Sequence, residues 1–231
     1  MRNTGKDNIK GQEQIMFVVY DAEKPPARYH PWTFSESNPE ERYVDFKTYP
    51  EQIPLVLPDF KPWARYAAIQ TFYNLLGWLN GVDSIFESND CGLRAPRRDV
   101  DTPEIVRNAF DADPIVVHGR LAIFFRDLAW NASGPSVDGL KTLILNFLRN
   151  NVRNIPAVVM IGEWDHLFTA IDKEGRAVTL RYWAWGDDEA MAMSYLDNTF
   201  SAIYRCLQWI SDGTKAARAL SPPDSARGNP L

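Results

Sequence analysis

The stretch Val178–Ile210, VTLRYWAWGDDEAMAMSYLDNTFSAIYRCLQWI, decides the fold. Its first eight residues partly alternate between apolar and polar and are rich in aromatics, which is typical of a half-buried strand. Gly186-Asp187-Asp188 then supplies a turn and a helix N-cap, and Glu189 adds negative charge where the helix dipole favours it. A helix to about Gly213 follows, because apolar residues recur every three or four positions on one face: Met191, Tyr195, Thr199, Ala202, Ile203, Cys206, Trp209 and Ile210.

Other segments show the same two periodicities. Strands are predicted at residues 15–20, 82–93, 115–117, 121–125, 157–161 and 167–171, and helices at 63–80, 137–150 and, in short form, 104–110. Asp172-Lys173-Glu174-Gly175 indicates a hairpin, and Gly119-Arg120 indicates a tight turn or a bulge. Many strands with few long helices predict an α+β fold: a mainly antiparallel sheet with about three long helices packed on one face.

Residues 14–213 are expected to form one domain between a disordered N-terminus, 1–13, and a loose C-terminal tail, 214–231. Within it, prolines punctuate residues 21–62, which excludes long helices and central strands there. We expect this segment, the proline-rich excursion, to run over the surface, because a long proline-rich connection cannot join the sheet centre. Within it, Ile53–Leu57 is a candidate edge strand. Aromatic residues should pin the excursion to the domain, namely Tyr29, Trp32, Phe34, Tyr43 and Phe46.

Composition narrows the classes of function. Of 231 residues, 45% are hydrophobic and 13% aromatic, enough for one large core. The net charge of −5 argues against direct binding of nucleic acid or an anionic membrane, because both require basic patches. Two cysteines, Cys91 and Cys206, are too few for a disulfide framework. With no apolar leader or membrane-length apolar run, the sequence predicts a cytoplasmic protein.

The densest polar cluster lies at residues 83–94, DSIFESNDCGLR. On a regular strand, alternate residues of this segment face opposite sides of the sheet. Glu87 could then pair with Asp90 or Asp127 for acid–base catalysis. The alternative is structural, because carboxylates at such positions commonly bond to backbone groups and to arginines, here Arg94, Arg120 and Arg126.

Other catalytic and metal-binding patterns are weak. Cys91 with His118 could act as nucleophile and base, although buried inert cysteine is the commoner case and Cys206 fits helix packing. His118, Asp165 and His166 lack the spacing of a metal motif, and no phosphate-binding glycine loop occurs. We therefore expect no enzyme activity, metal or cofactor. The alternative hypothesis is a small hydrolase or transferase that uses Glu87, Asp90, Cys91 and His118.

Aromatic residues mark one further surface. Arg181, Trp183 and Trp185 alternate along the predicted strand and so share one face. Packing between sheet and helix is the expected role of the two indoles. An exposed ring among carboxylates would instead indicate a protein-binding anchor.

Three segments carry a resemblance to a known class: Asn80–Cys91, Gly119–Leu128 and Tyr182–Asp187. Together they resemble bacterial immunity proteins, which are encoded beside polymorphic or type VI secretion toxins and protect the producing cell. Among these, the chain is most similar to the immunity protein 52 family, which accompanies restriction-endonuclease-like toxins.

The resemblance implies a protein that binds a cognate toxin and occludes its active site or its assembly, without chemistry of its own. An acidic chain suits a nuclease toxin with a basic cleft, because opposite potentials speed encounter. A structural subunit of a bacterial assembly is the remaining alternative, and a homodimer is left open. The predicted contact residues are acidic: Glu36, Glu40, Glu41, Asp99, Asp101, Asp187, Asp188 and Glu189.

Overall fold

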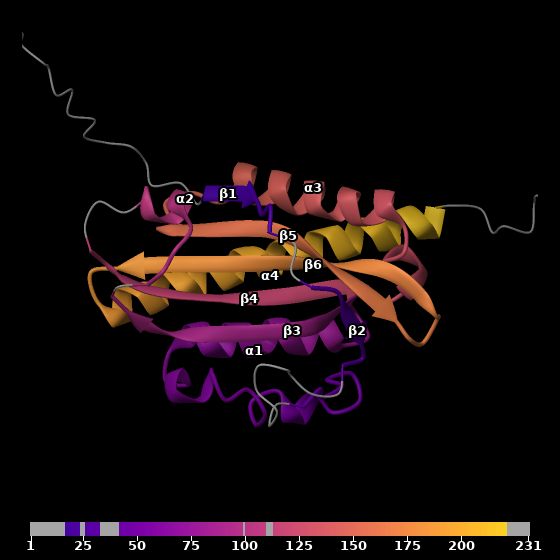
Figure 1. Cartoon of the computed structure of the whole chain (residues 1–231), viewed down its shortest axis with the longest axis horizontal. Coiled ribbons are helices and arrows are strands. Elements are labelled where there is room, and N and C mark those ends of the chain that lie inside the picture. The colour runs from indigo at the N-terminus through magenta and orange to yellow at the C-terminus, as the bar shows by residue number, and fades with distance from the viewer. Residues whose placement is uncertain (1–16, 24–25, 33–41, 99, 110–112, 221–231) are drawn as a thin grey trace, which may run out of the picture.

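The structure, a computed structural model, describes residues 17–23, 26–32, 42–98, 100–109 and 113–220. Within these residues the chain is α+β, with six strands in one mixed sheet (Figure 1). The strands are β1 (Phe17–Tyr20), β2 (Arg28–His30), β3 (Phe86–Arg97), β4 (Ile115–Phe125), β5 (Ala157–Phe168) and β6 (Lys173–Gly186). Their order is β1-β5-β6-β4-β3, and β2 also pairs with β5. The four long strands are antiparallel, whereas β1 and β2 run parallel to β5. The expected fold class is confirmed.

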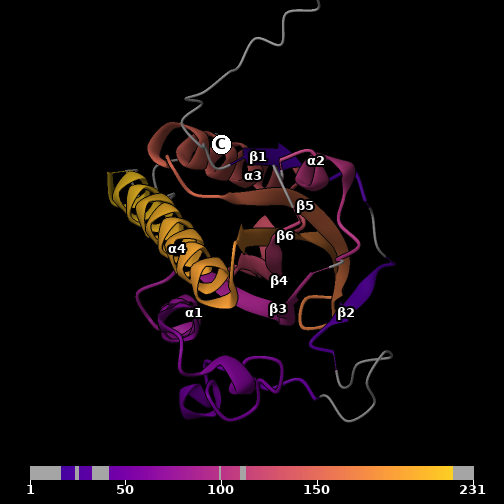
Figure 2. The same cartoon turned by 90° about the vertical axis from the view of Figure 1, so that its left-hand side faces the viewer.

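Three long helices cover one face of the sheet (Figure 2). They are α1 (Ala67–Asn80), α3 (Gly134–Asn151) and α4 (Glu189–Leu220). Each turns an apolar stripe to the sheet, and the main core lies between the two layers. A short helix, α2 (Glu104–Arg107), packs Val106 on Trp183 and Trp185 at the opposite face. The two tryptophans therefore pack between the sheet and a helix, as expected, and that helix is the short α2 on the face opposite the three long helices.

Hydrophobic periodicity alone predicts the buried face of helix α4 only in part. Asp188 accepts the Met191 N–H at 2.8 Å and so caps the helix as predicted, but the helix continues past Gly213 to Leu220. Met191 and Trp209, predicted to be core residues, are 39% and 55% exposed. The other predicted residues are mostly buried, namely Thr199, Ala202, Ile203, Cys206 and Ile210, and the buried face also takes in Ala192, Met193, Leu196, Phe200 and Leu207. The buried face is therefore wider than the predicted stripe, and the position of the sheet decides which apolar residues at its margins stay exposed.

Two strands are more regular than the sequence indicates. β4 runs unbroken through Gly119-Arg120, so no turn forms there. A Cβ at Gly119 would lie 2.1 Å from the Gly92 carbonyl oxygen and 2.7 Å from the Tyr182 hydroxyl, so glycine is needed for close approach. β5 likewise is continuous from Ala157 to Phe168 and leads into the predicted hairpin.

A bulge at Asn89 alters the alternation along β3. Ser88 lies opposite Ile123 and Asp90 lies opposite Ala122, so one residue of β3 is skipped. Glu87 and Asp90 consequently face the same side of the sheet, whereas regular alternation would place them on opposite sides. The strand also continues past Ala95-Pro96 to Arg97, further than predicted.

The proline-rich excursion is better packed than expected. Its described residues form β2 and the 3-10 turns η1 (Pro50–Gln52) and η2 (Lys61–Trp63), so Ile53–Leu57 is not an edge strand, and the predicted helix begins at Ala67. Trp32, Tyr43 and Phe46 are partly buried, as residues that anchor the segment should be, whereas Tyr29 is 63% exposed and does not anchor it. Phe34 and both chain ends, 1–16 and 221–231, lie outside the described residues. A third 3-10 turn, η3 (Leu128–Trp130), follows β4.

The sheet curls so that its two edges meet at one end. His30 of β2 bonds Asn89 of β3 at 2.9 Å, and Trp32 donates its indole N–H to the Asn89 carbonyl at 3.1 Å. Because β2 is attached to β5 and β3 is the opposite edge, these contacts close the sheet into a partial barrel (Figure 2). We call the side away from the three long helices the open face.

Candidate functional site

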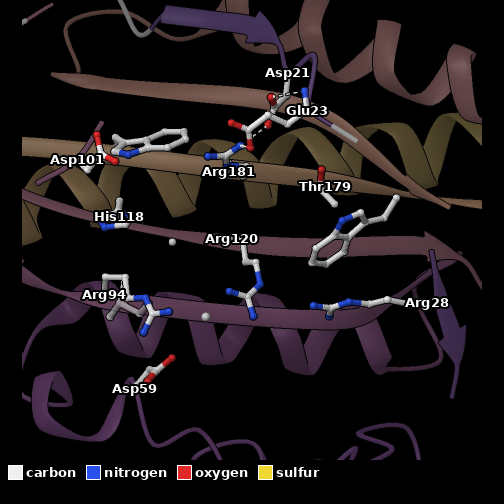
Figure 3. A pocket seen from close by; sticks show the side chains of 15 residues that line it. Asp21, Glu23, Arg28, Asp59, Arg94, Asp101, His118, Arg120, Thr179 and Arg181 are labelled. Atoms are coloured by element: carbon white, nitrogen blue, oxygen red, sulfur yellow. Dashed lines mark hydrogen bonds and ion pairs between the residues drawn. The ribbon is translucent and has the colours of Figure 1, made fainter. Parts of the chain in front are cut away.

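A cavity of about 590 Å³ lies on the open face (Figure 3). Side chains of β3, β4 and β6 form its floor, and Trp164 of β5 and Arg28 of β2 line it near the point where the sheet closes. Asp21 and Glu23, which follow β1, and Asp101, which follows β3, complete the rim. A volume of this size is typical of small-molecule sites.

Charged residues divide the cavity into two walls. Asp21, Glu23 and Asp101 lie along one wall, and Arg28, Arg94 and Arg120 lie along the other (Figure 3). We call these the acidic wall and the basic wall. Arg181 lies at the acidic wall, where it pairs with Asp21 at 2.9 Å and with Glu23. Since two carboxylates share that one guanidinium, the acidic wall keeps excess negative charge.

The basic wall keeps a small excess of positive charge, because its three arginines outnumber Asp90 and Asp59, which also lies on this side beside Arg94 (Figure 3). Asp90, buried behind it, accepts from Arg28 at 2.8 Å and from Arg120 Nε at 3.0 Å, so one carboxylate serves two guanidiniums. Arg94 is exposed and makes no ion pair within the described residues. Opposite charge surpluses therefore face each other across the cavity.

Three buried polar atoms belong to cavity-lining side chains and have no hydrogen-bond partner among the described residues: Trp164 Nε1, Trp183 Nε1 and His118 Nε2. Trp164 is 8% and Trp183 2% exposed. An indole N–H can only donate, so each of the two tryptophans lacks an acceptor. Buried donors without partners are rare, and the missing acceptor for each indole is a bound water or a ligand group.

The aromatic rings are held rigidly. The Arg28 guanidinium lies 4.1 Å from the centre of the Trp164 ring, and the Arg181 guanidinium 5.2 Å from that of Trp183. His118 lies parallel to Trp183, with ring centres 6.2 Å apart. Burial, with smaller contributions from the charges of Arg94, Arg97 and Arg181, lowers the pKa of His118 to about 4. The imidazole is therefore neutral at pH 7.

The four residues of the hydrolase hypothesis do not converge. Glu87 is 3% exposed and pairs with Lys47 at 2.7 Å and with Arg126 at 3.7 Å. Asp90 is bound by Arg28 and Arg120, as the structural alternative anticipated. Cys91 lines a neighbouring cavity of about 410 Å³, formed by β3 and the excursion, which His118 does not line. Asp127 is separately engaged, since it accepts the Ala129 N–H at the start of η3.

The three residues considered as metal ligands, His118, Asp165 and His166, do not form a common site either. His166 is fully engaged: Nδ1 bonds the Trp164 carbonyl at 3.0 Å and Nε2 bonds Asn89 at 2.6 Å. Asp165, its neighbour on β5, is exposed and points to the other side of the strand. In the described part of the chain, no group of three or more His, Cys, Asp or Glu side chains is placed to hold a metal ion.

The predicted contact residues have different environments. Glu36, Glu40, Glu41 and Asp99 lie outside the described residues. Asp101 lines the cavity, and Asp187 and Asp188 are exposed where β6 ends. Glu189 accepts from Arg65 at 2.6 Å and from the Tyr66 hydroxyl, so it already links the start of α4 to the segment before α1.

Sequence reasoning missed most of the cavity. It placed Arg181 and Trp183 on one face and named Arg94 only as a partner for carboxylates, and it gave no role in a cavity to Arg28 or Trp164. The missing information was register: His118 lies opposite Trp183 and Arg120 opposite Arg181, which brings their side chains together. Alternate polar residues on neighbouring strands were a signal, yet strand order is needed to combine them.

None of the helices in residues 17–220 that the structure describes is both long and apolar enough to cross a membrane. Comparison of the chain with protein-family models, with curated proteins and with solved structures finds no match in any of the three.

Proposed function

We propose that this chain is a cytoplasmic immunity protein, which binds a cognate bacterial toxin and neutralises it by occluding its active site or its assembly. The proposal begins from the resemblance of Asn80–Cys91, Gly119–Leu128 and Tyr182–Asp187 to such proteins. An immunity protein of this kind needs a stable scaffold with a complementary surface and no reactive groups of its own.

One structural observation carries the proposal further. The polar residues that most resembled a catalytic set, Glu87 and Asp90, are buried in ion pairs that tie β3 to other segments. Removing either partner of such a pair leaves a buried charge without compensation, so these residues have a structural use that explains their presence. This arrangement favours a binding scaffold over the hydrolase alternative.

The surface we assign to the toxin lies where β6 ends. Asp187 and Asp188 are exposed there, with Asp113 nearby through Arg98, which bonds the backbone carbonyls of both Asp187 and Asp113. A toxin with a basic nucleic-acid cleft would be drawn to carboxylates at this end, and the attraction would weaken as salt is added.

The test uses the toxin encoded beside this gene. The two proteins should co-elute as a stable complex, and the chain should block the toxin's activity. Replacing Asp187→Lys together with Asp188→Asn should lower the association rate at least tenfold, because the asparagine still caps α4 while the acidic surface is lost. The matched control is Asp165→Lys with Glu174→Gln, which makes the same change of net charge at the other end of the β5–β6 hairpin and should leave binding unchanged. Absence of any complex contradicts the proposed function; equal effects of both double variants contradict the assigned surface.

A further inference from the structure

We propose that the cavity on the open face binds a small zwitterion of the amino-acid or short-peptide class, with its carboxylate on the basic wall and its ammonium group on the acidic wall. This inference goes beyond the proposed function, since it concerns a free small molecule and does not require a toxin.

The argument starts with the two buried indoles. Trp164 and Trp183 are almost fully buried, line the cavity and present N–H groups without acceptors among the described residues. A buried donor left unpaired costs about 1–3 kcal/mol, so each indole favours an acceptor, which a bound water or a ligand oxygen supplies. Each N–H has less than 1 Å² of accessible surface, so a ligand oxygen in the cavity reaches it only when the ring turns toward the cavity.

The charge on the basic wall identifies the first ligand group. Arg28 and Arg120 share Asp90, and Arg94 has no ion pair within the described residues. Arginine donates in a planar fork that matches a carboxylate. Asp90 holds Arg120 from behind with two bonds, 3.0 and 3.3 Å, so that this guanidinium keeps a fixed orientation.

The acidic wall identifies the second group. A simple anion would be repelled by Asp21, Glu23 and Asp101, of which Asp21 and Glu23 share the single Arg181, so an anion alone does not explain the cavity. A ligand with an ammonium group can face these carboxylates while its carboxylate faces the arginines. The opposed walls seen in Figure 3 thus select a ligand that carries both charges.

Aromatic walls and volume limit the size. Trp164 and Trp183, with the neutral imidazole of His118, provide flat apolar surfaces for a side chain. The volume of about 590 Å³ is larger than one amino acid and accommodates a short peptide. Gly92, whose missing side chain leaves space beside Arg120 Nη1 and Asp59, keeps the floor open.

Calorimetric titration of the full chain with each of the twenty common amino acids and with glycylglycine tests the site. We expect at least one of them to bind with a dissociation constant below about 1 mM, because the site offers two charge-assisted contacts. That value is typical of a weak but specific ligand. The N-acetylated and the C-amidated forms of that same molecule should each bind at least tenfold more weakly, because each lacks one of the two charges.

Variants assign the contacts. Arg94→Gln and Asp101→Asn, both at exposed positions, should each weaken binding at least fivefold, and Trp183→Phe, which keeps a ring but removes the N–H, should do the same. Arg205→Gln and Asp212→Asn, exposed residues of α4 on the other side of the molecule, are the matched controls and should bind as wild type.

Three results would overturn the inference: no binding by any of these ligands, equal binding by the blocked forms, or binding that the cavity variants leave unchanged. Because no toxin is present, failure here leaves the immunity proposal standing. Failure of toxin binding likewise leaves this site standing.

Discussion

Asn89 joins the two edges of the curled sheet. Its Oδ1 accepts from His30 Nδ1 at 2.9 Å, and its Nδ2 donates to His166 Nε2 at 2.6 Å, while His166 Nδ1 donates to the Trp164 carbonyl. Each of these hydrogen bonds has one donor and one acceptor when both imidazoles are neutral. The side chain can occupy this position because the β-bulge turns it out of the ladder.

Asn89→Ala should therefore lower the free energy of unfolding by about 3 kcal/mol, because it leaves two buried imidazole nitrogens without partners. Urea unfolding followed by circular dichroism measures the change. Asn74→Ala, an exposed asparagine of α1, is the control and should cost less than about 0.5 kcal/mol. Equal losses for both variants would show that the Asn89 network contributes nothing.

Gly119 gives a second prediction for a single residue. Gly119→Ala would place a methyl group 2.1 Å from the Gly92 carbonyl oxygen, and the backbone of β3 cannot move away without breaking the Tyr182–Gly92 hydrogen bond of 3.0 Å. We expect a loss of about 3 kcal/mol or more in thermal or urea unfolding. Gly139→Ala in α3 meets no atom within 4 Å and should instead stabilise the helix by about 0.5–1 kcal/mol.

At the scale of single residues, the sequence marks Glu87, Asp90 and His118 as unusual, and the structure gives each a specific environment. The sequence alone does not distinguish a catalytic carboxylate from one in a buried ion pair, because the partners Lys47, Arg28 and Arg120 come from distant segments. The Asn89 bulge is also invisible in the sequence, and it puts Glu87 and Asp90 on one face.

At the scale of elements, hydrophobic periodicity finds the long helices and most strands, because each has one face that must be buried. The errors occur where several faces are apolar, as in α4, or where prolines leave short elements such as β2 and η1. Parallel pairing of β1 and β2 with β5 depends on contacts across the whole chain, so local pattern cannot predict it.

The difference between buried and exposed apolar residues of α4 can be measured. Phe200 is fully buried against Phe72 and Tyr182, so Phe200→Ala should cost about 3–5 kcal/mol in the free energy of unfolding. Trp209, 55% exposed and touching Phe147, should cost less than about 1 kcal/mol when replaced by alanine. The reverse order in chemical unfolding would place Trp209 in the core, as the sequence predicted.

At the scale of the whole molecule, two buried histidines, His30 and His166, and the partly buried His118 make stability depend on pH. Burial lowers the pKa values of His30 and His118 to about 4 and also lowers that of His166. Each imidazole is thus neutral in the folded protein, whereas the unfolded chain binds a proton near the ordinary pKa of about 6.5. The unfolded state binds more protons between these values, so stability rises with pH in this window.

Lowering the pH from 7 to 5 should therefore destabilise the protein, by about 2 kcal/mol through His30 alone. Urea unfolding at pH 7, 6 and 5 measures the effect. His118→Gln, which removes one titrating group, should reduce the pH dependence without abolishing it. A stability that stays constant or increases toward pH 5 would contradict the neutral imidazole network.

The architecture as a whole also explains why function is harder to predict than fold. The α+β class follows from local patterns, whereas the cavity exists only because the sheet curls until β2 meets β3. Residues from β2, β3, β4, β5 and β6 then surround one space, and no short motif contains them.

The central claim is that the chain protects a cell by binding a toxin, without chemistry at Cys91 or His118. The most direct measurement is survival of cells that express the neighbouring toxin together with the double variant Cys91→Ala/His118→Gln, at wild-type protein levels. We predict the same protection as the wild type gives. Loss of protection by a double variant that still folds and still binds the toxin would contradict the account.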